Sequence, residues 1–374
     1  MKFYRTSVFQ LLLGFVLYSM SCNGVAKAST KHNSKHHYLV TSVSDYGENV
    51  IFTKSADYNF ESNSKFVALV DGEEYELTSS LVKDTITHAG FGPTIGDRAN
   101  LYLYDASERV LSLFEVSSAA TASSLKPIAY SIPKDFKRVG RIYNVGDGLI
   151  ITSGNVRNTA VYFLNLKNKK LVKHTVLARG ERILDASQSK QGYKLLVSDL
   201  NESRISIKSI AKDKKTLSTV SYVHDRPINS AKLLGLNGNI ETAIIEETVS
   251  GVFSFNYGSK YSEVKFSASE KDSSSKKLFS LDSVRNQGAL EGVLFCANKG
   301  SVFWVNQSKT NVEINSTDSL KKDLSWHKDS LPISSFLRIN KDGNLQLIVN
   351  FSKDVDGYYN SGFTRMDVNE KCAK

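Results

Sequence analysis

The chain has 374 residues, of which 41% are hydrophobic and 10% aromatic, and its formal net charge is +10. This composition excludes an intrinsically disordered protein, and a total of only five prolines excludes a Pro-rich linker protein. The basic residues are scattered over short turns such as 167–170 and 212–215. Scattered basic turns are typical of a solvated surface, so the charge does not predict a nucleic-acid partner.

The first 28 residues have the pattern of a secretory signal peptide. Lys2 and Arg5 precede an apolar stretch at 8–20, and Ala26 and Ala28 form the small-x-small pattern that signal peptidase accepts. Cleavage after Ala28 would remove three basic residues and lower the formal charge from +10 to +7. The apolar stretch is short for a membrane span. We therefore expect a secreted or extracytoplasmic protein without a transmembrane span in the mature chain.

Two other readings of this N-terminus stay open. One is a lipoprotein signal in which Cys22 is acylated, although Ser19 stands where such signals normally have Leu. The other is a retained N-terminal anchor. After the predicted cleavage site, residues 29–37 form a basic segment that we expect to be flexible, as chain ends usually are. Its three histidines, His32, His36 and His37, are close together, but a flexible tail is the better interpretation, and no metal site is predicted.

From residue 38 to the end, one pattern recurs at intervals of 44 to 55 residues. A glycine, often preceded by Asp or Asn, follows one short apolar run and opens a second, and a polar turn then leads to a third. Runs of this kind, separated by Gly, Asn, Asp and Ser, are typical of strand-turn-strand units. The seven copies begin at Gly47, Gly96, Gly148, Gly192, Gly238, Gly288 and Gly343.

A repeat of this length that contains only short strands predicts a β-propeller. A single four-stranded sheet cannot bury both of its faces, whereas sheets packed face to face around an axis bury them. We expect an all-β protein in which residues 38–374 form one propeller domain. Seven blades of about 45–50 residues fit the copies best, with three or four strands in each, and six or eight blades stay open.

On these copies the chain resembles the seven-bladed β-propeller superfamily over roughly residues 37–372. The stretch 291–308, EGVLFCANKGSVFWVNQS, is similar to a strand pattern of the lactonase-type propellers in that superfamily. The Trp-Asp pair of one propeller class and the double glycine of another are missing. The resemblance implies a ring of blades. It does not assign any residue to catalysis.

Cleavage after Ala28 would leave two cysteines, Cys296 and Cys372. Two cysteines in an exported chain suggest a disulfide, with two buried free thiols as the alternative. Four sequons begin at Asn201, Asn306, Asn315 and Asn350 and would be candidate glycan sites in a secreted eukaryotic protein.

No local motif predicts a reaction. The glycines at 88–98 are followed by a strand rather than the helix that a phosphate cradle needs, so we interpret this stretch as a linker between blades. The segment HDRP at 224–227 is interpreted as a polar turn between blades. The catalytic residues therefore stay unknown, and neither a metal nor a cofactor is predicted.

The sequence thus favours an exported, non-catalytic propeller of the secreted-effector or surface-interaction type, and we expect a monomer. Its partner, a protein or a glycan, would be held by loops on one face or at the central opening. Two alternatives stay open: a lactonase-type hydrolase with an axial site, and a lipid-anchored envelope scaffold that requires acylated Cys22.

Overall fold

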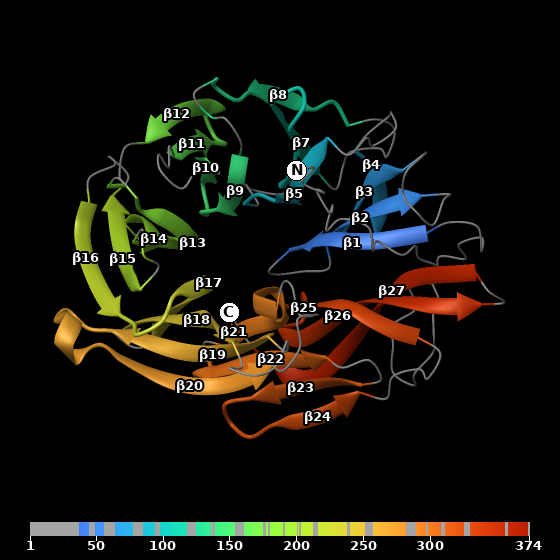
Figure 1. Ribbon diagram of the computed structural model, residues 1–374. Helices are drawn as coiled ribbons and strands as arrows, with labels where there is room; N and C mark the ends of the chain where they lie inside the picture. The colour runs from blue at the N-terminus through green and yellow to red at the C-terminus, as the bar shows by residue number, and fades with distance from the viewer. Residues whose placement is uncertain are drawn as a thin grey trace, which may run out of the picture.

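The computed structural model contains a ring of small antiparallel sheets (Figure 1). The residues that the structure describes are 37–44, 49–55, 64–77, 85–93, 98–117, 125–134, 136, 139–153, 161–174, 177–178, 180–189, 191–199, 201, 203–211, 216–237, 240–250, 257–281, 289–296, 298–307, 311–324, 330–355 and 358–372. The predicted signal peptide, Cys22, His32 and His36 lie outside them.

Seven sheets follow one another along the chain, and each forms one blade whose first strand is innermost. The first three blades are β1 His37–Val43, β2 Val50–Ser55, β3 Lys65–Val70 and β4 Glu73–Glu76; β5 Ile86–Phe91, β6 Arg98–Asp105, β7 Val110–Ser117 and β8 Ile128–Ser131; β9 Val139–Asn144, β10 Gly148–Ser153, β11 Val161–Asn165 and β12 Lys170–His174.

The remaining four blades complete the ring. They are β13 Arg182–Ser189, β14 Gly192–Ser198, β15 Arg204–Ala211 and β16 Thr216–Val223; β17 Ile228–Asn237, β18 Ile240–Ser250, β19 Tyr257–Phe266 and β20 Ser274–Leu281; β21 Val293–Cys296, β22 Ser301–Gln307, β23 Val312–Ser316 and β24 Lys321–Leu324; β25 Ser330–Ile339, β26 Asn344–Val355 and β27 Tyr358–Lys371. Two 3-10 turns, η1 Glu270–Asp272 and η2 Ala289–Gly292, are the only helical elements in the described part. The chain is a seven-bladed β-propeller, as the repeat predicted.

The glycine of each predicted copy marks the hairpin between the first two strands of a blade, at the three positions that the structure describes. Gly343 has a positive φ of 78°, which glycine adopts without strain. Gly148 and Gly192 are needed for a different reason. A Cβ atom at Gly192 would collide with the carbonyl oxygen of Ile210 on the neighbouring strand. Close approach of two backbones, rather than turn geometry, therefore requires glycine there.

A bulge recurs in the innermost strand of six of the seven blades. In β1, β5, β9, β13 and β25, one extra residue interrupts the pairing with the second strand, and β17 has two such interruptions. Asp185 directly follows such a bulge in β13, and His88 does so in β5. Bulges bend a strand and redirect its side chains. Here they lie where the inner strands of adjacent blades approach one another.

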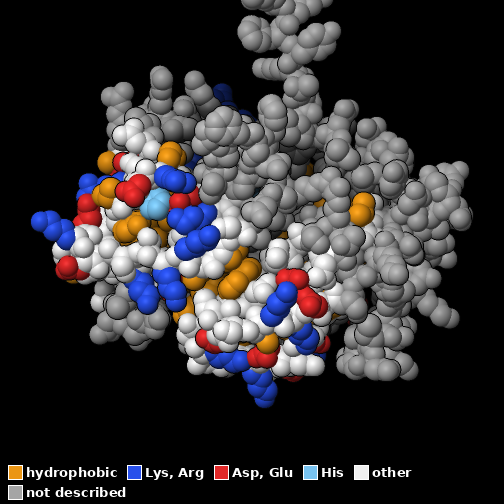
Figure 2. Space-filling view, turned by 60° about the horizontal axis from the view of Figure 1, so that its bottom comes forward, with side chains coloured by type: hydrophobic (Ala, Val, Ile, Leu, Met, Phe, Trp, Pro, Cys, Tyr) orange, Lys and Arg blue, Asp and Glu red, His pale blue; other side chains and the backbone are white. Residues whose placement is uncertain are grey.

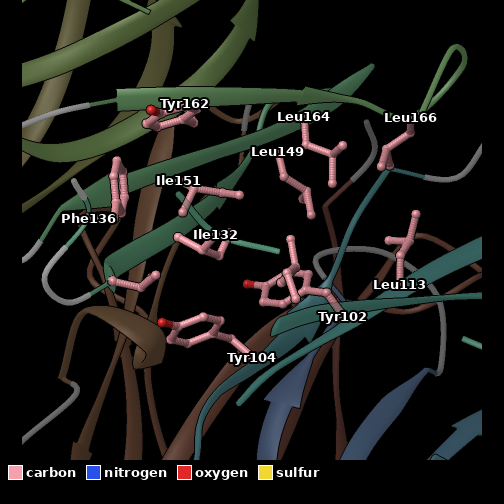
Figure 3. Packing of buried hydrophobic residues seen from close by; sticks show 12 residues of the cluster. Tyr102, Tyr104, Leu113, Ile132, Phe136, Leu149, Ile151, Tyr162, Leu164 and Leu166 are labelled. Carbon is pink, nitrogen blue, oxygen red and sulfur yellow. The ribbon is translucent and has the colours of Figure 1, made fainter. Parts of the chain in front are cut away.

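The core lies between the blades. Seven clusters of buried apolar side chains fill the structure, and each takes its members from two blades that are neighbours in the ring. Figure 3 shows the cluster between the second and third blades, where Tyr102 and Leu113 face Leu149 and Ile151. Packing each sheet against both neighbours buries the two faces that a single blade would leave in water.

The described residues contain no helix that is both long enough and apolar enough to cross a membrane.

Candidate functional site

Polar side chains on the inner strands connect neighbouring blades. His88 Nε2 lies 2.9 Å from the carbonyl oxygen of Gly140 in the next blade, and Arg141 donates to the carbonyl of Leu184 at 3.1 Å. Asp185 Oδ2 accepts the backbone N–H of Leu233 at 2.7 Å. The fourth such link is made by Lys232, which donates to the carbonyl of Val293 at 2.9 Å. Four successive blade contacts thus use an inner-strand polar group as a structural link.

A hydrolase of the lactonase type would need a site at the axis, formed by side chains of the inner strands. Several of these side chains instead bond to neighbouring blades. Within the described ranges, no three His, Cys, Asp or Glu side chains group closely enough to hold a metal ion. His88, Arg141, Asp185 and Lys232 on the inner strands bond to backbone instead. A pocket lined by charged side chains lies elsewhere, at the junction of the fourth and fifth blades.

A pocket of about 390 Å³ opens at this junction. Its first wall is the turn between β16 and β17, which supplies His224, Asp225 and Arg226. Its second wall is the fifth blade, where Glu247 lies near the end of β18 and Lys260 near the start of β19. Lys277 and Ser280 on β20 complete the lining. We call this side of the ring, where the β16–β17 and β18–β19 connections lie, the loop face.

The register of the fifth blade brings the pocket together. Ile228 on β17 pairs with Glu247, Glu247 pairs with Lys260, and Lys260 pairs with Ser280. One row therefore runs across all four strands at the loop face. Because the β16–β17 turn ends directly before Ile228, it places His224 and its neighbours beside this row. In Figure 2, the left half of the view shows a histidine among Lys, Arg, Asp and Glu side chains.

Glu247 is the buried charge of the pocket. Its side chain is 1% exposed, and Oε1 lies 3.1 Å from His224 Nε2 and 3.4 Å from Lys260 Nζ. The hydroxyl of Ser262 lies 3.5 Å from the same oxygen. A buried carboxylate is tolerated only where cations and donors surround it. Glu247 therefore holds Lys260 and His224 in place at the base of the pocket.

His224 lies between Tyr222 and Glu247. The Tyr222 hydroxyl lies 3.3 Å from Nδ1, and the two rings are 5.8 Å apart. The side chain is 9% exposed, and its Nε2 makes no hydrogen bond to any described residue, since its approach to Glu247 is outside hydrogen-bond geometry. Buried polar atoms in native proteins normally have a partner. The neighbour that the structure gives this nitrogen is the Glu247 carboxylate at 3.1 Å.

Two of the three cations that line the pocket are free. Arg226 and Lys277 are exposed and have no ion-pair or hydrogen-bond partner among the residues with assigned positions. Lys260 is paired with Glu247. The lining carries three positive side chains and two negative ones, Asp225 being the second acid. The pocket therefore combines a small excess of positive charge with acceptors for hydroxyl groups.

Glu246, the residue before Glu247, points to the other side of the sheet. It accepts hydrogen bonds from the hydroxyls of Ser259 at 2.8 Å and Tyr261 at 2.9 Å, and also from Ser230. Burial raises the pKa of Tyr261 well above its usual value, and the Glu246 carboxylate raises it further. The adjacent acids of β18 thus have separate roles, one in the core and one in the pocket.

No family model matches the chain. No curated protein matches it either. Among solved structures, a proposed 6-phosphogluconolactonase from Bacteroides fragilis is 13% identical, with a TM-score of 0.44, over 93% of this chain and 98% of that one. A proposed 6-phosphogluconolactonase from Bacteroides uniformis is 12% identical, with a TM-score of 0.43, over 86% and 93%. A BBS1N structure in complex with ARL6DN is 13% identical, with a TM-score of 0.43, over 77% and 84%. These similarities concern the fold alone.

The sequence motifs have mixed outcomes in the structure. The segment 224–227 is the turn between two blades, as predicted, but its role in a pocket was missed because Glu247 and Lys260 lie farther along the chain. The interpretation of 88–98 as a linker between blades was wrong. It spans the hairpin between β5 and β6, which pair directly with each other within the second blade. The stretch 291–308 contains the β21–β22 hairpin of the sixth blade.

Cys296 and Cys372 lie together as a buried pair that can form a disulfide, with Cα atoms 5.2 Å apart. The pair joins the inner strand of the sixth blade to the end of the seventh. Of the glycan candidates, Asn201 and Asn306 are exposed and Asn315 is half-buried. Asn350 is fully buried, and the folded protein has no space for a glycan there.

Proposed function

We propose that this chain is an exported propeller that binds a partner without catalysis, and that the loop-face pocket between the fourth and fifth blades holds that partner. One contrast supports the proposal. Inner-strand polar groups such as Asp185 and Lys232 bond to the backbone of neighbouring blades. Arg226 and Lys277 line the pocket and have no hydrogen bond or ion pair to a described residue. Arg226 and Lys277 are therefore available to a ligand on the loop face.

Export is proposed from the N-terminal pattern together with the cysteine pair. Lys2, Arg5 and the apolar stretch at 8–20 match a secretory signal, and disulfides persist in oxidising compartments. A secreted effector or surface-interaction protein fits both features. Rigid scaffolds commonly present binding residues on loops, which fits a pocket built from turns at the end of a sheet.

The experiment compares the purified chain with an Arg226→Glu/Lys277→Glu variant on arrays of defined glycans and defined extracellular proteins. Lys276→Glu is the matched control, because Lys276 is an exposed neighbour of Lys277 on β20 that does not line the pocket. We expect a bound component that the double variant loses and the control retains. All three proteins should melt at similar temperatures, since the replaced side chains are exposed.

A parallel assay follows hydrolysis of a panel of sugar lactones. The proposal predicts no turnover. Turnover that falls in an Asp185→Asn variant would overturn it in favour of an axial hydrolase, because Asp185 lies on an inner strand. An array in which no component distinguishes the double variant from the control would also overturn it.

A further inference from the structure

The charges and unbonded groups of the loop-face pocket point to one class of ligand. We infer that the pocket binds a sugar unit that carries a single carboxylate. This inference rests on the proposed function and adds the chemistry of the ligand. It depends on two observations: two cations that have no partner among the described residues, and acidic side chains beside them.

The cations favour a carboxylate. Arg226 and Lys277 line the pocket from opposite walls, the β16–β17 turn and β20, and neither has a partner among the described residues. An arginine side chain bonds a carboxylate through two parallel N–H groups, and a lysine adds a point charge. A ligand anion in the pocket would be the missing partner of both.

The acids limit the charge of that ligand. Asp225 lines the pocket with its side chain exposed, and Glu247 lies buried at the base. A densely charged anion would be repelled by these two groups, whereas one carboxylate is balanced by Arg226 and Lys277. Asp225 and Ser280 can accept hydrogen bonds from hydroxyl groups. A sugar acid has one negative charge and several hydroxyls, and it therefore matches both sets of groups better than an acidic peptide does.

His224 forms part of the pocket wall and is positioned by two neighbours. Its side chain is 9% exposed, and Nε2 has no hydrogen bond to a described residue. Tyr222 bonds the ring at Nδ1, and Glu247 lies beside Nε2 and limits the movement of the ring. The volume of about 390 Å³ is in the range of small-molecule sites and has room for one sugar unit.

The test measures binding of methyl glucuronide by isothermal titration calorimetry, with methyl glucoside as the neutral comparison. We expect the neutral sugar to bind at least about 10-fold more weakly, since it lacks the charge-assisted bonds. Arg226→Ala and Lys277→Ala should each weaken glucuronide binding by about 10-fold, while Lys276→Ala leaves it unchanged. All three substitutions are of exposed side chains, so folding should be preserved.

Further measurements identify the source of the sugar acid. They also define the results that would contradict the inference. An oligosaccharide ending in glucuronate that binds more tightly than the free sugar supports a glycan end, and equal binding supports a free sugar acid. Equal binding of the neutral glucoside, absence of glucuronide binding, or preference for an acetylated aspartate peptide would overturn the inference. If the arrays still show a component that needs Arg226 and Lys277, the inference alone fails and the proposed function stands.

Discussion

Asn350 on β26 pairs with the backbone of Val40 on β1, although 310 residues separate them. The N–H of Val40 donates to Asn350 Oδ1 at 3.2 Å, and Asn350 Nδ2 donates to the carbonyl of Val40 at 3.1 Å. The side-chain amide of Asn350 thus makes the two hydrogen bonds to Val40 that a residue of a neighbouring β-strand would make. These bonds join the last blade to the first. The seventh blade has three strands in the described part, and none of them comes from the N-terminus. A side chain therefore helps to close the ring at this junction.

The first prediction concerns this closure. Asn350→Ala should lower the free energy of unfolding by about 3 kcal/mol, because it leaves buried backbone groups of Val40 without partners. Urea denaturation measures the change. Asn306→Ala is the control, because Asn306 is an exposed asparagine on β22 and should cost less than about 0.5 kcal/mol. Equal effects of the two substitutions would show that the Asn350 amide does not hold the ring together.

The blades could be predicted from sequence because each one is local. The glycine hairpins and apolar runs of a blade lie within about 50 residues of one another, and their spacing repeats. The contact between Asn350 and Val40 has no such signal, since one asparagine among many gives no sign of its distant partner. The interpretation of 88–98 failed for a related reason. A hairpin inside a blade and a connection between blades have the same turn chemistry.

The pocket could not be predicted because it depends on register. Glu247 and Lys260 are brought together by direct pairing of β18 with β19, and the bulge at Ile228–Ser230 sets how β17 meets Glu247. A shift of one residue would turn Glu247 to the side of the sheet that Glu246 occupies. The sequence identified the turn at 224–227 but carried no mark of the bulge. A sequence signal for such a pocket would be a polar turn followed by two neighbouring strands, one carrying a glutamate and the other a lysine.

The second prediction separates the two reasons for glycine in the hairpins. Gly192→Ala should destabilise the protein by more than about 2 kcal/mol, because the new methyl group would collide with the Ile210 carbonyl and force β14 and β15 apart. Gly343→Ala should cost only about 1 kcal/mol, since its Cβ would meet open space and the cost comes from the positive φ alone. Thermal unfolding of both variants, followed by circular dichroism, gives the comparison. The reverse order would contradict the steric explanation.

The third prediction concerns Cys296 and Cys372. The purified protein should contain no free thiol from either residue under denaturing, non-reducing conditions, as mass spectrometry after alkylation would show. Reduction should lower its stability by up to about 4 kcal/mol, because the bridge closes a long loop in the unfolded chain. A Cys296→Ala/Cys372→Ala variant should be less stable and insensitive to reductant. Alkylation of both residues without reductant would instead establish two buried free thiols.

The fourth prediction uses the turn between β6 and β7. Burial alone would raise the pKa of Asp105, but hydrogen bonds from the N–H of Glu108, from the hydroxyl and N–H of Ser107 and from Thr85 outweigh it and lower that pKa. The folded protein therefore favours the ionised carboxyl. A lowered folded-state pKa adds stability above the pKa of the unfolded chain, and that stability is lost as the pH falls through the folded-state value.

Asp105→Asn tests the sign of this effect. The substitution keeps a side-chain oxygen in the turn and removes the charge, so wild type should be more stable near neutral pH, by up to about 1 kcal/mol because solvent screens this part-exposed site. The difference should shrink as the pH falls through the titration range of the folded carboxyl. Urea denaturation of both proteins across pH 3–7 would measure it, and Glu108→Gln, an exposed change in the same turn, is the control. A difference that stays constant over this range would mean that the carboxylate charge contributes nothing to the turn.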